Sequence, residues 1–172
     1  MVQIGNYHIG KAENAEKPVL DSGEAFLLWD ELVSRYDIIE LTQIYLNFAH
    51  DPDFKQLLRR GLFNTLEKQV NILEKEANRY QILLPNRPPK SVNIPADTTL
   101  LEDRFMFRQI FLGIQYMIDT HIRTIRSFTT NDPLRKMFIQ FAKDELDIFN
   151  NLCKFGKLKG WLQAPPVYQT PQ

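Results

Sequence analysis

The positions of the prolines constrain the fold of this chain more than any other feature of its sequence. Long stretches without proline alternate with short breaks that contain it, and apolar residues recur within each stretch every three or four positions, which is typical of amphipathic helices. Asp21 followed by Glu24, and Asp51 next to Pro52, are helix-start signals because short acidic side chains accept hydrogen bonds from free backbone N–H groups. The expected helices span residues 21–49, 52–80, 99–128 and, after the break at 130–133, up to about residue 157.

The connections between these helices predict their arrangement. The Asp-Pro breaks at 51–52 and 132–133 are short, so each joins two helices into an antiparallel hairpin. The two breaks lie 81 residues apart, and Pro85 and Pro165 lie 80 apart, which suggests a weak internal repeat. The proline-rich stretch 83–98 can run the length of the body at about 3 Å per residue, which makes the second and third helices parallel. The sequence therefore predicts an all-α, ferritin-like four-helix bundle over residues 21–163, with an irregular arm at 1–20 and an irregular tail at 164–172.

Charge balance and cysteine content exclude several classes of protein. Lys and Arg number 21, as do Asp and Glu, and this zero net charge disfavours a strongly basic nucleic-acid binder. Cys153 is the single cysteine, so a disulfide scaffold and a cysteine-based metal cluster are excluded. No apolar run reaches the about 18 residues of a membrane span, and residues 1–11 lack the pattern of a secretion signal. We therefore expect a cytoplasmic protein that binds neither nucleic acid nor membrane.

A few polar side chains fall on the apolar faces of the expected helices. Glu40 and His121 each lie 11 residues before an Asp-Pro break, while Glu145, Thr65 and Gln69 lie at comparable distances after one. Equal distance from the turn of an antiparallel hairpin means similar height, so these five side chains should converge near the middle of the bundle. An unpaired buried carboxylate costs several kcal/mol, so they must satisfy one another or a bound group.

Two interpretations of this cluster remain open. A ferritin-like dinuclear site needs two Glu-x-x-His motifs, and none occurs in the chain. Glu40, His121 and Glu145 could still hold a single divalent ion of iron, manganese or zinc together with water. The simpler interpretation is a buried polar network, shared with Thr65 and Gln69, that fixes the register of the helices and needs no cofactor.

Six short segments of the chain form a recognisable set: ELVSRY at 31–36, QVNILEK at 69–75, PPK at 88–90, TND at 130–132, KLKGWL at 157–162 and PP at 165–166. Together they resemble an uncharacterised family of endospore-forming Firmicutes that is similar to spore coat proteins, akin to coat protein F. The resemblance covers about residues 20–168. It implies a ferritin-like fold and a role linked to sporulation, in the cytoplasm or the spore coat, and it supplies no catalytic residues.

These observations favour a non-enzymatic helical-bundle protein of unknown specific role, associated with sporulation or the spore coat. The alternative is a metal-binding ferritin-like protein with a degenerate single-metal site. A third, weaker hypothesis is a bundle whose aromatic core leaves a pocket for a small molecule. The high aromatic content, with 12 Phe, 6 Tyr and 2 Trp, predicts exposed apolar surface and hence a homodimer, with other spore coat proteins as further partners.

Overall fold

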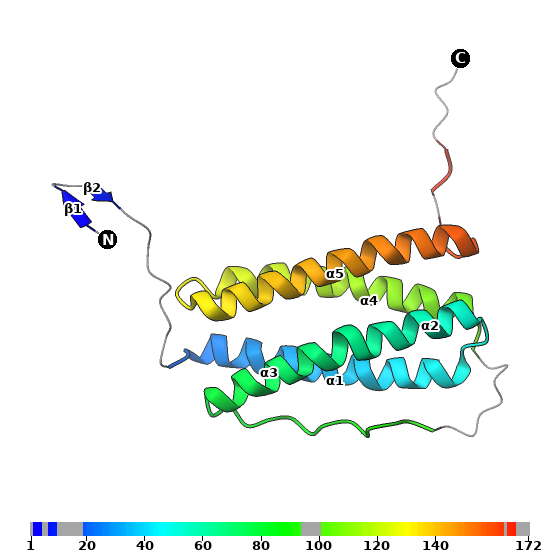
Figure 1. Cartoon of the computed structure of the whole chain (residues 1–172), viewed down its shortest axis with the longest axis horizontal. Helices are drawn as coiled ribbons and strands as arrows, with labels where there is room; N and C mark the ends of the chain where they lie inside the picture. The colour runs from blue at the N-terminus through cyan, green and yellow to red at the C-terminus, as the bar shows by residue number, and fades with distance from the viewer. Residues whose placement is uncertain (1, 5–6, 10–18, 94–100, 164, 168–172) are drawn as a thin grey trace, which may run out of the picture.

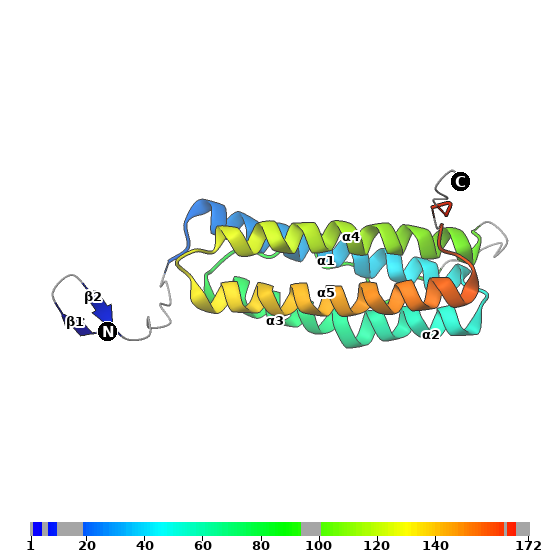
Figure 2. The same cartoon turned by 90° about the horizontal axis from the view of Figure 1, so that it is seen from above.

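Four long helical segments lie side by side in the computed structural model, which describes residues 2–4, 7–9, 19–93, 101–163 and 165–167 (Figures 1 and 2). The second segment is continuous but consists of three labelled parts. The elements are α1 (Ser22–Phe48), α2 (Pro52–Gly61), η1 (Leu62–Leu66), α3 (Glu67–Arg79), α4 (Asp103–Ser127) and α5 (Asp132–Lys159). The prediction of an all-helical body with four long helices is thus confirmed.

The N-terminal arm differs from its prediction as an irregular segment. Strands β1 (Val2–Ile4) and β2 (Tyr7–Ile9) pair antiparallel, with Val2 opposite Ile9. The strands are only three residues long, too short for the sequence pattern to separate them from irregular structure. In the tail, residues 165–167 have no regular secondary structure, and residues 164 and 168–172 lie outside the described part.

Local side-chain signals set the helix starts. Asp21 and Glu24 form the expected capping box, in which the Asp21 carboxylate accepts from the Glu24 N–H at 2.8 Å and Glu24 accepts from the Asp21 N–H at 3.2 Å. The Asp51 carboxylate caps α2 by accepting from the backbone N–H groups of Asp53 and Phe54, and Asn131 accepts from the backbone N–H of Leu134 at the start of α5. α4 starts at Asp103, four residues later than predicted; residues 99 and 100 lie outside the described part.

The connection after α3 runs back along the body toward the start of α4 (Figure 1). Side chains of α1 hold it: Gln43 donates to the carbonyl of Lys90 at 3.2 Å and Asn47 to that of Val92 at 2.7 Å. Its residues 83–93 have no helix or strand, as predicted, and 94–98 of the expected connection lie outside the described residues. α3 and α4 consequently run in the same direction, as the long crossover predicted.

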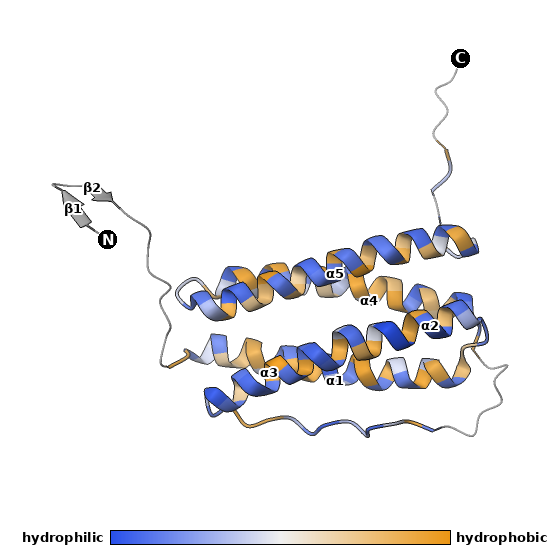
Figure 3. Ribbon diagram, in the orientation of Figure 1, coloured by the Kyte–Doolittle hydropathy of each residue, from blue (hydrophilic) through white to orange (hydrophobic). Residues whose placement is uncertain are grey.

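Each helix buries one face, and Figure 3 shows the resulting mixture of apolar and polar residues along every helix. α1 packs against α3 and α5 against α4, and the two hairpins meet through α1 and α4. The buried apolar residues form two clusters, one near the α4–α5 turn and one near the α1–α2 turn. On α5, Phe141 belongs to the first cluster and Leu152 to the second, with the buried Glu145 between them. The body therefore has a polar layer between two apolar ones.

A short π-helix of five residues, η1, called the π-turn below, interrupts the second segment where one uninterrupted helix was expected. Its buried residues Phe54, Leu58, Leu62, Leu66 and Val70 follow one another at four-residue steps. Four residues exceed one α-helical turn by about 40°, so a long series of such steps drifts around a regular helix. The wider turn of η1 absorbs this drift and keeps the series facing inward.

Candidate functional site

The polar layer is built around Arg35, a buried arginine of α1. Its Nη2 lies 2.7 Å from Oε1 of Glu145 on α5 and 2.9 Å from Nε2 of His121 on α4, while its Nε lies 3.1 Å from Oε1 of Glu31. His121 Nε2 also lies 2.8 Å from that same Glu31 oxygen. All four residues are at most 3% exposed. We call Glu31, Arg35, His121 and Glu145 the charge cluster.

Helix geometry explains how the charge cluster forms. Glu31 and Arg35 are four residues apart and therefore share a face of α1. The aromatic rings of Phe138 and Phe141 lie 6.3 and 6.0 Å from the His121 ring and cover it. With water excluded in this way, the ion pairs of Arg35 are stronger than surface pairs, and each partner depends on the others for compensation.

The electrostatics of the charge cluster favour the ionised form of Glu31. Burial alone would raise the pKa of Glu31, but its hydrogen bond with His121 and the charge of Arg35 together hold that pKa below the usual value. The charge cluster sets two carboxyl groups, those of Glu31 and Glu145, against the single guanidinium of Arg35.

Several polar atoms of the charge cluster have no hydrogen-bond partner among the described residues. They include the acceptors Oε2 of Glu31 and Oε2 of Glu145, the donor Nε of Arg35, and Nδ1 of His121, whose role depends on the tautomer. His121 Nε2 can donate to Glu31 or accept from Arg35, but it cannot do both at once. The two carboxylate oxygens without partners can only accept, so an additional hydrogen-bond donor beside them would stabilise the cluster.

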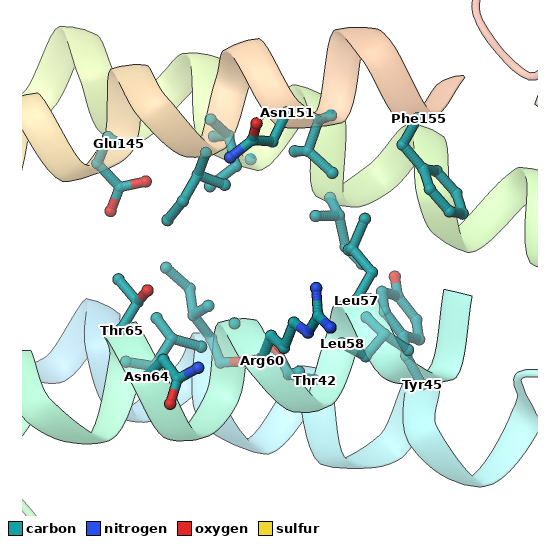
Figure 4. A pocket seen from close by; sticks show the side chains of 18 of the residues that line it. Thr42, Tyr45, Leu57, Leu58, Arg60, Asn64, Thr65, Glu145, Asn151 and Phe155 are labelled. Carbon is teal, nitrogen blue, oxygen red and sulfur yellow. Dashed lines mark hydrogen bonds between the residues drawn. The ribbon is translucent and has the colours of Figure 1, made fainter. Parts of the chain in front are cut away.

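A cavity of about 810 Å³ adjoins the charge cluster and extends between the two hairpins. Arg35 and Glu145 line one end, and most of the remaining wall is apolar, with Ile38, Leu66 and Ile148 among its residues. Figure 4 shows Glu145 on α5 facing Thr65 on η1 across this space. The cavity combines a mostly apolar wall with Arg35 and Glu145 at one end, and the charged residues Asp53 and Arg60 also line it. A largely apolar wall with a few polar groups is the usual make-up of small-molecule sites.

The structure brings together two of the three predicted metal ligands. His121 and Glu145 both contact Arg35, whereas Glu40 is half-buried and is not among the contacts of the charge cluster. Within the described residues, no group of three His, Cys, Asp or Glu side chains is placed to hold a metal ion. Thr65 lines the cavity, and Gln69 is buried without a hydrogen-bond partner in the described part, so neither joins the charge cluster.

Sequence reasoning missed Arg35 and Glu31, which are buried on α1. A helical wheel drawn from the sequence places Trp29 on the inner face of this helix, yet Trp29 is 37% exposed and Leu28 is fully buried, so the true inner face is rotated. A signal was available: two carboxylates and a histidine facing inward require a cation, and Arg35 is spaced to pair with Glu31.

The comparisons with known proteins agree with this architecture. The model of a family described as "Protein of unknown function (DUF3231)" matches residues 9–172. The chain belongs to the DUF3231 family. No curated protein sequence matches this DUF3231 chain.

Among solved structures, a crystal structure from Bacillus halodurans has a similar fold. It is described as that of a "putative spore coat protein", with a TM-score of 0.79 and 22% sequence identity. The match covers 88% of the DUF3231 chain and 97% of the other. At this identity the likeness shows the fold. In the described part of the DUF3231 chain, no helix has both the length and the apolar character needed to cross a membrane.

Proposed function

We propose that this protein is a non-enzymatic, ferritin-like four-helix-bundle protein that serves a structural role in sporulation or the spore coat. The contacts of Arg35 with Glu31, His121 and Glu145 carry the proposal. Ferritin-like carboxylate proteins use inward-facing carboxylates and histidines to hold metal ions at this level of the bundle. In this chain a guanidinium occupies the centre of such a group and compensates part of its negative charge, so the cluster holds the two hairpins together as an internal clamp.

Two observations support the link with spores. The sequence segments that resemble spore-coat-like proteins extend over most of the chain, and the Bacillus halodurans structure that shares the fold is described in similar terms.

Partners in this role would be a second copy of the chain or other coat proteins. Exposed apolar side chains favour such contacts, since Leu112 and Tyr116 on α4 are 59% and 64% exposed. Light scattering tests the homodimer, and immunodetection in coat extracts of spores from the source organism tests the location.

The clamp is tested by replacing Arg35 with methionine. The Arg35→Met variant leaves two buried carboxylates without their cation, so we expect a loss of about 3–5 kcal/mol in the free energy of unfolding. Arg126→Met, the same change at an exposed position of α4, should cost less than about 0.5 kcal/mol. Urea denaturation followed by circular dichroism measures both. Equal stability of the two variants would contradict the clamp.

The alternative of a single divalent metal bound by Glu40, His121 and Glu145 is tested on the same protein. Elemental analysis of protein purified without a histidine tag, after incubation with iron, manganese or zinc and dialysis, should give well below one ion per chain. Stoichiometric metal that is lost in Glu145→Ala would overturn the non-enzymatic proposal and favour the metal-binding one.

A further inference from the structure

We infer that the cavity between the two hairpins binds a small amphipathic amine, whose protonated amino group contacts Glu145 and whose apolar body lies along the cavity. The inference goes beyond the structural role proposed above, which requires no ligand. Three features of the cavity carry it, namely its size and wall, the unpaired acceptor at its inner end, and the way the helices leave it open.

The size and wall of the cavity suit a small apolar body. Its volume of about 810 Å³ lies within the range of about 300–1,000 Å³ that small-ligand sites occupy. Aliphatic side chains from all four helical segments line the cavity; they include Ile38 of α1, Leu66 of η1, Ile114 of α4 and Ile148 of α5. Asp53 and Arg60 are the charged lining residues outside the charge cluster. An apolar chain placed there would be removed from water, at a gain of about 0.8 kcal/mol for each buried methylene group.

The inner end of the cavity calls for a positively charged donor. Glu145 is 1% exposed, lines the cavity, and its Oε2 has no hydrogen-bond partner among the described residues. Arg35, the one guanidinium of the charge cluster, is shared between Glu145 and Glu31. A protonated amine at Glu145 would supply the missing donor and the second positive charge, and the Thr65 hydroxyl opposite could accept from the same group (Figure 4). A carboxylate ligand would add a third negative charge to the same place.

The helix arrangement gives the ligand access. The hairpins meet mainly through α1 and α4, while α2 and η1 face α5 across the cavity (Figure 4). The π-turn η1 contributes Leu62 to the core and Thr65 to the cavity wall, so the irregular turn lies at the polar end. π-turns inside α-helices are frequent at functional sites, because the altered turn directs side chains that a regular helix would place elsewhere.

The test compares three probes with the same chain length: octylamine, 1-octanol and octanoate, titrated calorimetrically into the full chain at pH 7. We expect one octylamine to bind per chain, at least tenfold more tightly than 1-octanol, with octanoate the weakest. In Glu145→Gln the affinity for octylamine should fall about tenfold while that for 1-octanol is unchanged. Asp147→Asn, an exposed acidic residue of the same helix, is the matched control and should leave all three affinities unchanged.

A second variant keeps the test decisive if Glu145→Gln does not fold. Gly113 of α4 lines the cavity, and a Cβ built there meets no atom within 4 Å. Gly113→Leu should therefore fold, fill the cavity and abolish binding of both octylamine and 1-octanol. Equal affinity for octylamine and octanoate, or no octylamine binding by the wild-type chain, would overturn the inference. A dimer by light scattering without octylamine binding would assign the cavity to a second copy instead.

Discussion

At the scale of single residues, the polar layer depends on compensation between buried charges. Glu31 is removed from water, which opposes its ionisation, yet His121 and Arg35 lower its pKa overall. The carboxylate is therefore more stable as an anion in the folded protein than in the unfolded chain. Folding stability must then depend on pH through this group.

Acidification should reveal this dependence. A carboxyl group with a lowered folded-state pKa adds stability above its unfolded value of 4.5, and that stability is lost as the pH falls through the folded-state pKa. At pH 7 we expect the free energy of unfolding of Glu31→Gln to be about 2 kcal/mol lower than that of the wild type. Below pH 4.5 the difference in free energy of unfolding between the two proteins should become smaller. Urea midpoints measured between pH 3 and 7 check this, with exposed Asp37→Asn as control; a gap that stays constant with pH would contradict it.

Only half of the charge cluster could be predicted from sequence. His121 and Glu145 interrupt clear apolar stripes, so their burial follows from helical periodicity. Arg35 and Glu31 were missed because charged residues on a helix ordinarily face solvent. The inner face expected for α1 was also rotated slightly from the true one, so that Trp29 instead of Leu28 was placed in the core. Glu40, chosen instead, is only half-buried. Which of several neighbouring acidic residues turns inward depends on the packing of three helices, which no single helix pattern contains.

At the scale of elements, proline breaks and helix caps are local signals, and they predicted the four long helices within a few residues. The π-turn was missed because η1 has no special composition. The sequence feature from which η1 could have been predicted is the series of apolar residues at four-residue steps from Phe54 to Val70, all of which are buried.

Deletion of one residue tests this account of η1. Removing the exposed Asn64 should convert the π-turn into regular α-helix while the residues on both sides stay in register, so we expect a loss below about 1 kcal/mol. Removing the exposed Asn71 from regular α3 should rotate Leu73 and Ala77 by about 100° away from the core and cost more than about 4 kcal/mol. Unfolding midpoints compare the two, and equal losses would refute the account.

The end of α5 gives a second prediction at this scale. A Cβ at Gly156 would lie 2.6 Å from both the Leu162 and the Phe107 side chains, within an aromatic cluster that includes Trp161. Gly156→Ala should therefore destabilise the protein by about 1–3 kcal/mol. Gly113→Ala, at an open helical position, should stabilise it by about 0.5–1 kcal/mol through the higher helix propensity of alanine. Thermal melting measures both effects, and a change of the melting temperature in the same direction in both variants would contradict this prediction.

At the scale of the whole molecule, the crossover joins two hairpins that share one core. It is held to α1 by the side chains of Gln43 and Asn47, and Arg87 adds an ion pair with Glu74 at 3.2 Å. Its length and prolines predicted this course. The bonds that hold it were not predicted, because they join residues 45 and 47 positions apart.

Limited trypsin digestion can measure how firmly the crossover is held. The Lys90–Ser91 bond lies beside the carbonyl that accepts from Gln43, so Gln43→Ala should open this site and raise its cleavage rate about fivefold, as expected for the loss of one hydrogen bond of about 1 kcal/mol. Asn78→Ala, at an exposed position of α3, is the control. We expect the two fragments to stay associated through α1 and α4. Separation of the fragments under native conditions would show that the hairpins do not share a core.

The turn between α1 and α2 is tied to distant parts of the chain. Asp103 accepts from the backbone N–H groups of His50 and Asp51, and Lys159 donates to Asp51 and Asp53, so the last turn of α5 secures the first turn of α2. During synthesis the ribosome adds Lys159 more than a hundred residues after Asp51. The Lys159 bonds of the first hairpin, and the cover that α5 gives to its side of the cavity, can therefore form only after α5 has been synthesised to its last residue.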